Sequence, residues 1–225
     1  GDGPRATPTI FEGKVYTMGG TGIINCLELE TGKLLWSRNL IKELQGEVQR
    51  WGMANSPLIL PEGKGVVFAG PEKPGPTLVA CDLLTGKDVW VYQGVGASYS
   101  SPRIMTFSGV EQIVSVNATS VSGVDPATGK ELWSHPWPGN FPKVAQPLAY
   151  GDDGLLVTAS YGVGSLLLKI SSESGVFAAG QQSRSTRLKT KFSSPAILGD
   201  HAYGLDEGRL ACIDLLTGER VWKNE

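Results

Sequence analysis

The 225-residue chain is poor in the residues that build metal, redox and disulfide sites. It has two histidines, His135 and His201, which are far apart in the sequence, and three cysteines without a Cys-x-x-Cys spacing. No zinc-ligand pattern surrounds either histidine, and an odd number of cysteines does not make a disulfide framework. The sequence therefore predicts no metal ligands. Cys26, Cys81 and Cys212 are interpreted as small buried side chains, with metal or redox chemistry as the alternative.

Long apolar runs and an excess of one charge are also missing. No run approaches the roughly 20 apolar residues that a membrane-spanning helix needs. The first residues, GDGPRATPT, lack the basic and then apolar segments of a signal peptide. The formal net charge is only −2, so no overall field attracts nucleic acid or an anionic membrane. These absences predict no transmembrane segment, no nucleic-acid partner and no signal peptide within this chain.

Glycine and proline are plentiful, with 30 and 14 residues, and they indicate a turn-rich chain with little room for long helices. Hydrophobic residues make up 40% of the chain and charged residues 19%, a balance typical of a globular protein. The length suits one large all-β domain or two smaller ones.

One stretch recurs almost unchanged, as VACDLLTGKDVW at 79–90 and ACIDLLTGERVW at 211–222. Two looser copies, CLELETGKLLW and GVDPATGKELW, occupy 26–36 and 123–133. Aligned on the glycine, the copies share an acid four residues before it and a tryptophan four residues after it. A Ser-Pro, Thr-Pro or Gln-Pro pair precedes each unit, 45 to 49 residues apart, which gives five units. The structural motif residues are Gly32, Trp36, Asp82, Gly86, Trp90, Asp125, Gly129, Trp133, Asp214, Gly218 and Trp222.

Each unit reads as four short strands separated by turn residues. The acid before the turn can accept backbone N–H bonds, and the glycine can take the positive φ that a tight hairpin requires. The tryptophan across the turn offers a large flat surface, which we place between adjacent sheets. Four-stranded units of about 45 residues that stack radially are the blades of a β-propeller.

The D-x-x-T-G-[KE]-x-x-W pattern resembles the quinoprotein, or PQQ-like, propeller repeat. That family includes the PQQ-dependent dehydrogenases and the periplasmic propeller lipoprotein of the outer-membrane assembly machine. The resemblance covers residues 1–225 as one propeller segment, with blades at about 6–40, 55–93, 100–136, 145–182 and 193–225. Unit four departs from the pattern, because Ser171, Ser174 and Ala179 replace its acid, threonine and tryptophan. Family rings usually have seven or eight blades, so the resemblance implies an arc of a larger all-β ring, with a closed five-blade ring as the alternative.

Enzymes of this family hold a quinone cofactor on a calcium ion. The resemblance would therefore imply a catalytic aspartate, oxygen ligands for calcium and, in many members, an adjacent cysteine pair. No two cysteines are adjacent here, and most aspartates fall in turns. We predict a non-catalytic scaffold of a bacterial, periplasmic or otherwise extracytoplasmic kind, with no catalytic residue, metal ligand or cofactor. The alternative is part of a dehydrogenase that depends on PQQ and calcium.

The connections between blades carry the candidate binding residues. In a propeller these loops line the face around the channel, opposite the T-G turns, and loops on a rigid scaffold often carry function. Their aromatic side chains offer the flat surfaces typical of interface hot spots, and a local basic run adds charge. The predicted binding residues are Trp51, Asn55, Tyr99, Trp137, Arg187 and Lys189. We expect a protein, or a polar polymer such as a carbohydrate, at this face, and we expect Trp51 and Tyr99 to approach one another.

Overall fold

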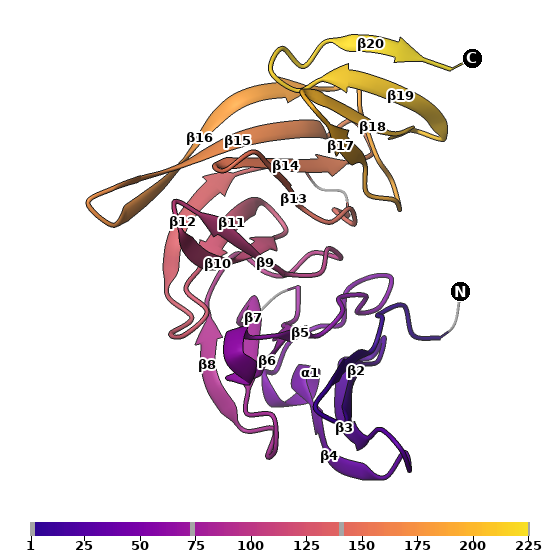
Figure 1. Cartoon of the computed structure of the whole chain (residues 1–225). Coiled ribbons are helices and arrows are strands. Elements are labelled where there is room, and N and C mark those ends of the chain that lie inside the picture. The colour runs from indigo at the N-terminus through magenta and orange to yellow at the C-terminus, as the bar shows by residue number, and fades with distance from the viewer. Residues whose placement is uncertain (1–2, 73–74, 140–141, 225) are drawn as a thin grey trace.

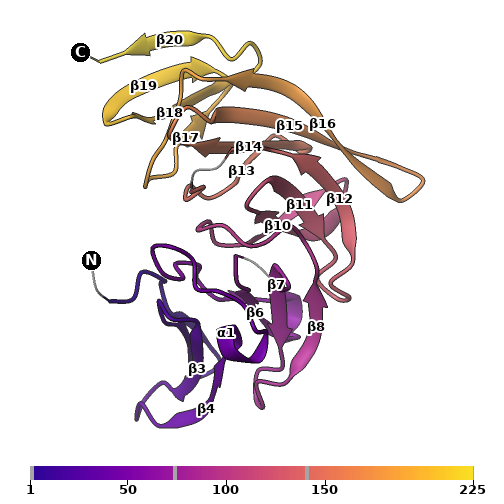
Figure 2. The ribbon, with the colours of Figure 1, turned by 180° about the vertical axis from the view of Figure 1, so that it is seen from behind.

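The computed structural model describes residues 3–72, 75–139 and 142–224, in which five four-stranded antiparallel sheets follow one another along the chain. Each sheet consists of four consecutive strands in sequence order. Figure 1 shows the sheets arranged around an open arc, with β5, β9, β13 and β17 on its inner side and β8, β12, β16 and β20 on its outer side. The view from behind shows the same arc (Figure 2). The predicted fold class, an all-β propeller with five blades present, is confirmed.

The first sheet contains β1 (Thr9–Phe11), β2 (Lys14–Met18), β3 (Ile23–Glu28) and β4 (Leu34–Asn39). The second contains β5 (Leu58–Ile59), β6 (Val66–Ala69), β7 (Leu78–Cys81) and β8 (Asp88–Tyr92). The third contains β9 (Arg103–Phe107), β10 (Val110–Val116), β11 (Ser120–Val124) and β12 (Glu131–Pro136). The fourth contains β13 (Leu148–Tyr150), β14 (Gly154–Ala159), β15 (Gly164–Glu173) and β16 (Val176–Ser185). The fifth contains β17 (Ala196–Leu198), β18 (His201–Asp206), β19 (Arg209–Asp214) and β20 (Arg220–Lys223).

Two short helical segments accompany the sheets, α1 (Leu40–Glu43) after β4 and a 3-10 turn at Pro61–Gly63. Asn39 caps α1, because its side chain accepts a hydrogen bond from the backbone N–H of Lys42. Residues 1–2 and 225, at the ends of the predicted propeller segment, lie outside the described residues.

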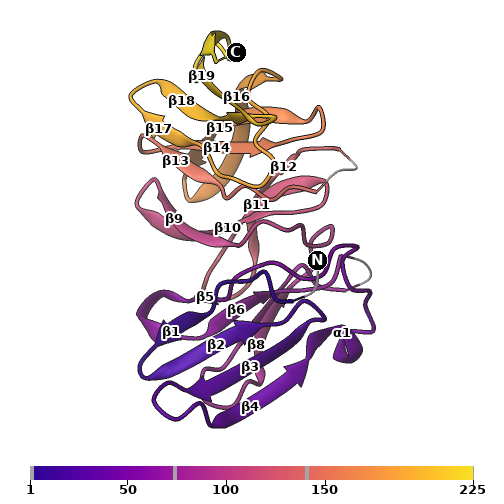
Figure 3. The same ribbon diagram turned by 90° about the vertical axis from the view of Figure 1, so that its right-hand side faces the viewer.

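The core lies between the sheets rather than within one of them. Four clusters of buried apolar side chains fill the four spaces between successive sheets. Strands in the middle of a sheet are buried on both faces, so β6, β7 and β14 are continuous runs of buried residues rather than alternating ones. In Figure 3 the sheets are seen from the side, with the first at the bottom and the fifth at the top. Neighbouring blades therefore hold one another by burial of apolar surface.

The repeated motif joins the first sheet to the second and the second to the third. The indole of Trp36 lies so close to Gly86 that a Cβ there would come within 2.7 Å of the ring, and its N–H donates to the Leu83 carbonyl at 3.0 Å. Trp90 repeats this arrangement one sheet further on, against Gly129 and the Pro126 carbonyl. Both glycines have positive φ, 70° and 73°, so the turn and the close approach each require glycine.

The acid of the motif closes its own turn. Asp82 accepts hydrogen bonds from the backbone N–H groups of Leu84 and Thr85 and from the Thr85 hydroxyl, and these bonds hold its pKa below the usual range. Asp214 binds Thr217 in the same way through the backbone N–H and the hydroxyl. The acid and threonine of the pattern are therefore a local turn clamp.

Blade four corrects the sequence alignment. In the other four sheets a register shift directly follows the residue that pairs with the motif tryptophan, as at Cys26 opposite Trp36. In the fourth sheet the shift follows Leu167, which pairs with Ser183. Ser183 therefore occupies the tryptophan position, and the placement of Ala179 there was wrong.

The reason is the length of the β15–β16 hairpin. Both strands have ten residues, so Gly175 lies further from the register shift than the other motif glycines do. Figure 1 shows this hairpin extending outward beyond the arc. Ser183 still donates a hydrogen bond to the Leu215 carbonyl of the fifth sheet, the counterpart of the Leu83 carbonyl that Trp36 binds.

Candidate binding site on the inner side of the arc

The residues that precede the repeated prolines link successive blade connections. The backbone N–H of Thr7 donates to the Ser56 hydroxyl at 3.0 Å, and that of Ser56 donates to the Ser101 hydroxyl at 2.8 Å. The N–H of Gln146 donates to the Ser194 hydroxyl at 3.0 Å. The Ser100 hydroxyl donates to the Ala145 carbonyl at 2.9 Å and links the remaining step. Hydrogen bonds therefore connect the successive loops at the inner side of the arc.

Trp51 and Tyr99, from successive connections, form an aromatic platform on this surface. Their ring centroids lie 5.8 Å apart, as expected from the sequence, and the Trp51 backbone N–H donates to the Tyr99 hydroxyl at 3.3 Å. Arg5 donates to the Trp51 carbonyl at 2.6 Å, and the Arg50 guanidinium lies 4.9 Å from the centroid of the Trp51 ring system. Trp51 is nevertheless 48% exposed. The platform is held in place and remains accessible.

The platform borders a hollow of about 700 Å³, which we call the inner hollow. This volume lies in the range of known ligand pockets, about 300–1,000 Å³. Residues that precede or connect the inner strands of several sheets line it, and aromatic and hydroxyl groups are prominent among them. The lining includes Arg5, Trp51, Ser56, Tyr99, Ser101, Pro142, Tyr161, Phe192 and Ser194. Phe192 is 72% exposed, and the ammonium of Lys191 lies 5.3 Å from its ring centroid.

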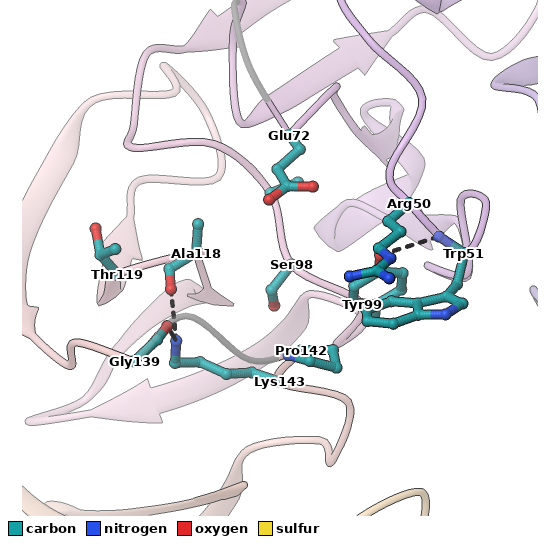
Figure 4. Close-up of a pocket in the computed structure, with 11 residues that line it drawn as sticks. Arg50, Trp51, Glu72, Ser98, Tyr99, Ala118, Thr119, Gly139, Pro142 and Lys143 are labelled. Atoms are coloured by element: carbon teal, nitrogen blue, oxygen red, sulfur yellow. Dashed lines mark hydrogen bonds between the residues drawn. The ribbon is translucent and has the colours of Figure 1, made fainter. Parts of the chain in front are cut away.

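A second, smaller pocket shares Trp51, Tyr99 and Pro142 with the inner hollow and has a volume of about 260 Å³. We call it the Lys143 pocket. In Figure 4 Arg50, Trp51 and Tyr99 lie on one side of it and Lys143, Ala118 and Gly139 on the other. Glu72 and Ser98 also belong to its lining.

Two predicted binding residues are buried and do not present a contact surface. Trp137 is 1% exposed and packs in the layer between the third and fourth sheets. Asn55 is also buried, and its amide donates to the carbonyls of Ser98 and Ser100 at 2.9 and 2.6 Å. The aromatic ring of Trp137 supports the core, and Asn55 ties one connection to the next.

One of the two predicted basic residues, Lys189, belongs to a cluster around a buried acid, which the sequence pattern did not reveal. The carboxylate of Asp206 is fully buried and pairs with Lys189 at 2.9 Å, Lys223 at 2.6 Å and Arg220 at 3.2 Å. Burial raises the pKa of Asp206, but the hydrogen bonds from Lys223 and Lys189 outweigh that effect and the pKa lies below its usual range. Lys189 is thus a structural ion-pair partner.

Arg187 is placed differently from Lys189. Its side chain is half exposed, and its Nε lies 3.5 Å from the Glu219 carboxylate beside the last T-G turn. Neither Arg187 nor Lys189 lines the inner hollow or the Lys143 pocket. The structure brings Trp51 and Tyr99 together and leaves the two basic residues apart from them.

The lining of the inner hollow does not fit a calcium-bound quinone. Calcium needs several converging oxygen ligands, usually with carboxylates among them. The described lining of the hollow offers hydroxyl groups and no carboxylate. Across the described parts of the chain, no three or more His, Cys, Asp or Glu side chains gather in a way that could hold a metal ion.

The cysteines pack in the core. All three are free and buried, and burial raises the pKa of Cys81 to about 12. A thiol with so high a pKa stays protonated and unreactive at neutral pH. In the three described stretches, no helix is long and apolar enough to cross a membrane.

Comparison with known proteins places these features in a family. The PQQ-like family model described as "Outer membrane protein assembly factor BamB" matches residues 1–224. Outer membrane protein assembly factor BamB of Shewanella oneidensis is 22% identical over 226 residues, which cover 97% of this chain and 56% of that protein. This chain therefore spans little more than half the length of that relative.

Solved structures show the same fold. The structure of BamB from Moraxella catarrhalis matches 98% of this chain and 61% of its own, with a TM-score of 0.67 and 18% identity. A europium-containing methanol dehydrogenase matches 97% of this chain and 61% of its own, with a TM-score of 0.61 and 14% identity. The resemblance to the PQQ-like repeat that the motif indicated is confirmed.

Proposed function

Because the chain belongs to the PQQ-like propeller family of outer membrane protein assembly factor BamB, we propose that it is a non-catalytic, periplasmic scaffold that binds a protein partner of outer-membrane protein assembly. The observation that carries this proposal is the exposed Trp51–Tyr99 platform at the edge of the inner hollow. The partner would lie on the inner side of the arc, across the blade connections.

The platform has the properties of an interface hot spot. Tryptophan, tyrosine and arginine dominate the binding energy of protein interfaces, and Trp51, Tyr99 and Arg50 lie in contact here. The hydrogen bonds of Trp51 to Tyr99 and Arg5 fix the backbone of the connection before any partner arrives. A surface that is already ordered loses less conformational entropy on binding.

The dehydrogenase alternative has weaker support. Its solved relatives share the fold at low identity, and the donor set of the inner hollow does not fit a calcium-bound quinone. The purified chain with excess PQQ and calcium should therefore give no alcohol-dependent dye reduction. Turnover above that of a heat-inactivated sample would favour the alternative.

The scaffold is tested by site-specific photocrosslinking in bacterial cells. A photoreactive phenylalanine analogue at Trp51 should capture a protein of outer-membrane assembly, identified by mass spectrometry. The same group at Lys87, on a T-G turn, is the control and should capture none. With the captured partner purified, Trp51→Ala and Tyr99→Ala should each weaken binding by about 2 kcal/mol or more, and Lys87→Ala should not. Capture from Lys87 alone would show that the turn face binds, and binding of a polysaccharide in place of protein would favour a polymer ligand.

A further inference from the structure

The Lys143 pocket contains a buried positive charge without an acidic partner among the described residues. Lys143 is 1% exposed, and its ammonium donates to the carbonyls of Ala118 and Gly139. None of the ion pairs found in the described parts of the chain includes Lys143. The two carbonyls use two of the three N–H donors of an ammonium and neutralise none of its charge.

Such a charge is costly to bury, so its surroundings are informative. An ammonium removed from water normally acquires a carboxylate partner or loses its proton. Burial lowers the pKa of Lys143 from 10.5 to about 8, which still leaves most molecules charged at neutral pH. The ammonium lies 5.4 Å from the centroid of the Trp137 ring system, and an aromatic face attracts a cation. The two backbone carbonyls and the Trp137 ring favour the charged ammonium, but they do not neutralise its charge.

The pocket has the size and the charge to accept a small anion. Its volume of about 260 Å³ is below the usual range for drug-sized ligands, about 300–1,000 Å³, and suits an amino-acid side chain. Two cations, Lys143 and Arg50, line it together with one acid, Glu72, and no ion pair found among the described residues joins that acid to either cation. Figure 4 shows the two cations on opposite sides of the pocket.

We propose that the Lys143 pocket binds a carboxylate, supplied by an acidic side chain of the protein partner. This inference rests on the proposed function, because the pocket shares Trp51, Tyr99 and Pro142 with the inner hollow. The partner's backbone would cross the platform, and its Asp or Glu side chain would enter between Arg50 and Lys143. The buried ammonium then gains the counter-charge that it lacks, which makes this contact specific for an acid over its amide.

The test uses the whole chain with ¹³C-labelled lysine ε-carbons, and Lys143→Met assigns the Lys143 signal. One probe is sodium acetate, and the other is a blocked pentapeptide, acetyl-Gly-Ser-Glu-Ser-Gly-amide, at millimolar concentration. Sodium chloride at equal ionic strength and the same peptide with Gln in place of Glu are the controls. Both carboxylate probes should move the Lys143 signal and raise its titration midpoint by about one pH unit or more, because a nearby opposite charge favours the charged amine.

The outcomes are separable. A response to acetate without a response to the Glu peptide would overturn the partner side chain as the source and assign the pocket to small free carboxylates. No response to either probe, or an equal response to chloride and the Gln peptide, would overturn the carboxylate site. In both cases crosslinking from Trp51 still reports on the scaffold itself. If the scaffold and the pocket are both correct, Lys143→Met should weaken the captured partner at least tenfold, whereas Lys87→Met leaves its affinity unchanged.

Discussion

The joints between blades predict a large difference between two tryptophans that occupy the same motif position. Trp90 is 9% exposed, packs on Gly129 of the third sheet and donates to the Pro126 carbonyl at 3.1 Å. Trp222 belongs to the fifth sheet, the last one described, and is 39% exposed. Trp90→Ala should therefore empty a space between two sheets, while Trp222→Ala removes a ring that is partly in water already.

The magnitudes follow from this burial. Truncation of a buried tryptophan to alanine costs about 3–5 kcal/mol of unfolding free energy, which includes the cavity that is left. For Trp222 we expect roughly 1–2 kcal/mol, because apolar stabilisation scales with the area removed from water. Urea unfolding followed by far-UV circular dichroism measures both variants without relying on tryptophan fluorescence. Equal losses for Trp90→Ala and Trp222→Ala would refute the view that the motif ring stabilises the joint between blades.

A double-mutant cycle tests the contact directly. A Cβ at Gly129 would lie 2.5 Å from the Trp90 ring, and its φ of 73° strains any residue with a side chain. Gly129→Ala alone therefore combines a clash with backbone strain, and Trp90→Ala should remove only the clash. The double variant should lose less stability than the sum of the single variants. Simple additivity would mean that the two residues do not press on one another.

Three further predictions concern the buried charges and the long hairpin. The pKa of Lys143 is about 8 in the folded chain and 10.5 in the unfolded chain, so the folded chain binds fewer protons between these two pH values. Relative to Lys143→Met, the free energy of unfolding should therefore rise by about 3 kcal/mol from pH 8 to pH 10.5, as measured by urea unfolding. Asp206→Asn leaves three cations without their carboxylate and should cost about 3–5 kcal/mol, whereas Glu62→Gln in the exposed pair with Lys64 should cause no measurable change. Amides of β14 should be as protected from hydrogen exchange as those of β6, because all residues of both strands are buried; faster exchange in β14 would show that the missing tryptophan loosens blade four.

The fold was predictable because each unit repeats the same local chemistry. An acid, a glycine and a tryptophan at fixed spacing recur in four units. The acid closes a turn, the glycine takes positive φ and the tryptophan provides a large apolar surface, and each of these roles can be inferred from a single unit. The Trp51–Tyr99 contact followed from the same periodicity, because successive blade connections lie side by side. Periodic signals therefore predict both the blades and the neighbourhood of equivalent loops.

The burial of Trp137 and Lys143 has no such signal. Both lie in the connection from the third to the fourth sheet, which reads as an ordinary polar loop with an aromatic residue. In the folded chain the backbone N–H of Trp137 donates to the Thr119 carbonyl, and the Lys143 ammonium donates to the neighbouring Ala118 carbonyl. The burial depends on how two loops distant in sequence pack together, and the composition of one loop does not reveal it.

Blade four shows why spacing from a turn is weaker information than strand register. The alignment on Gly175 assumed hairpins of constant length. A hairpin can, however, gain residue pairs at its tip while the pairing of the strands near the neighbouring blades stays the same. The extension brings Phe177 and Ala179 against the apolar layer shared with the third sheet, and the Ala179 carbonyl lies 3.2 Å from the His135 ring nitrogen. This added contact faces the third sheet, whereas Ser183 faces the fifth with a single hydrogen bond. The fourth sheet therefore gains contact with the third sheet, while it lacks the tryptophan contact to the fifth sheet. The joint between the fourth and fifth sheets is held chiefly by their shared apolar layer around Leu156, Leu167 and Ile213.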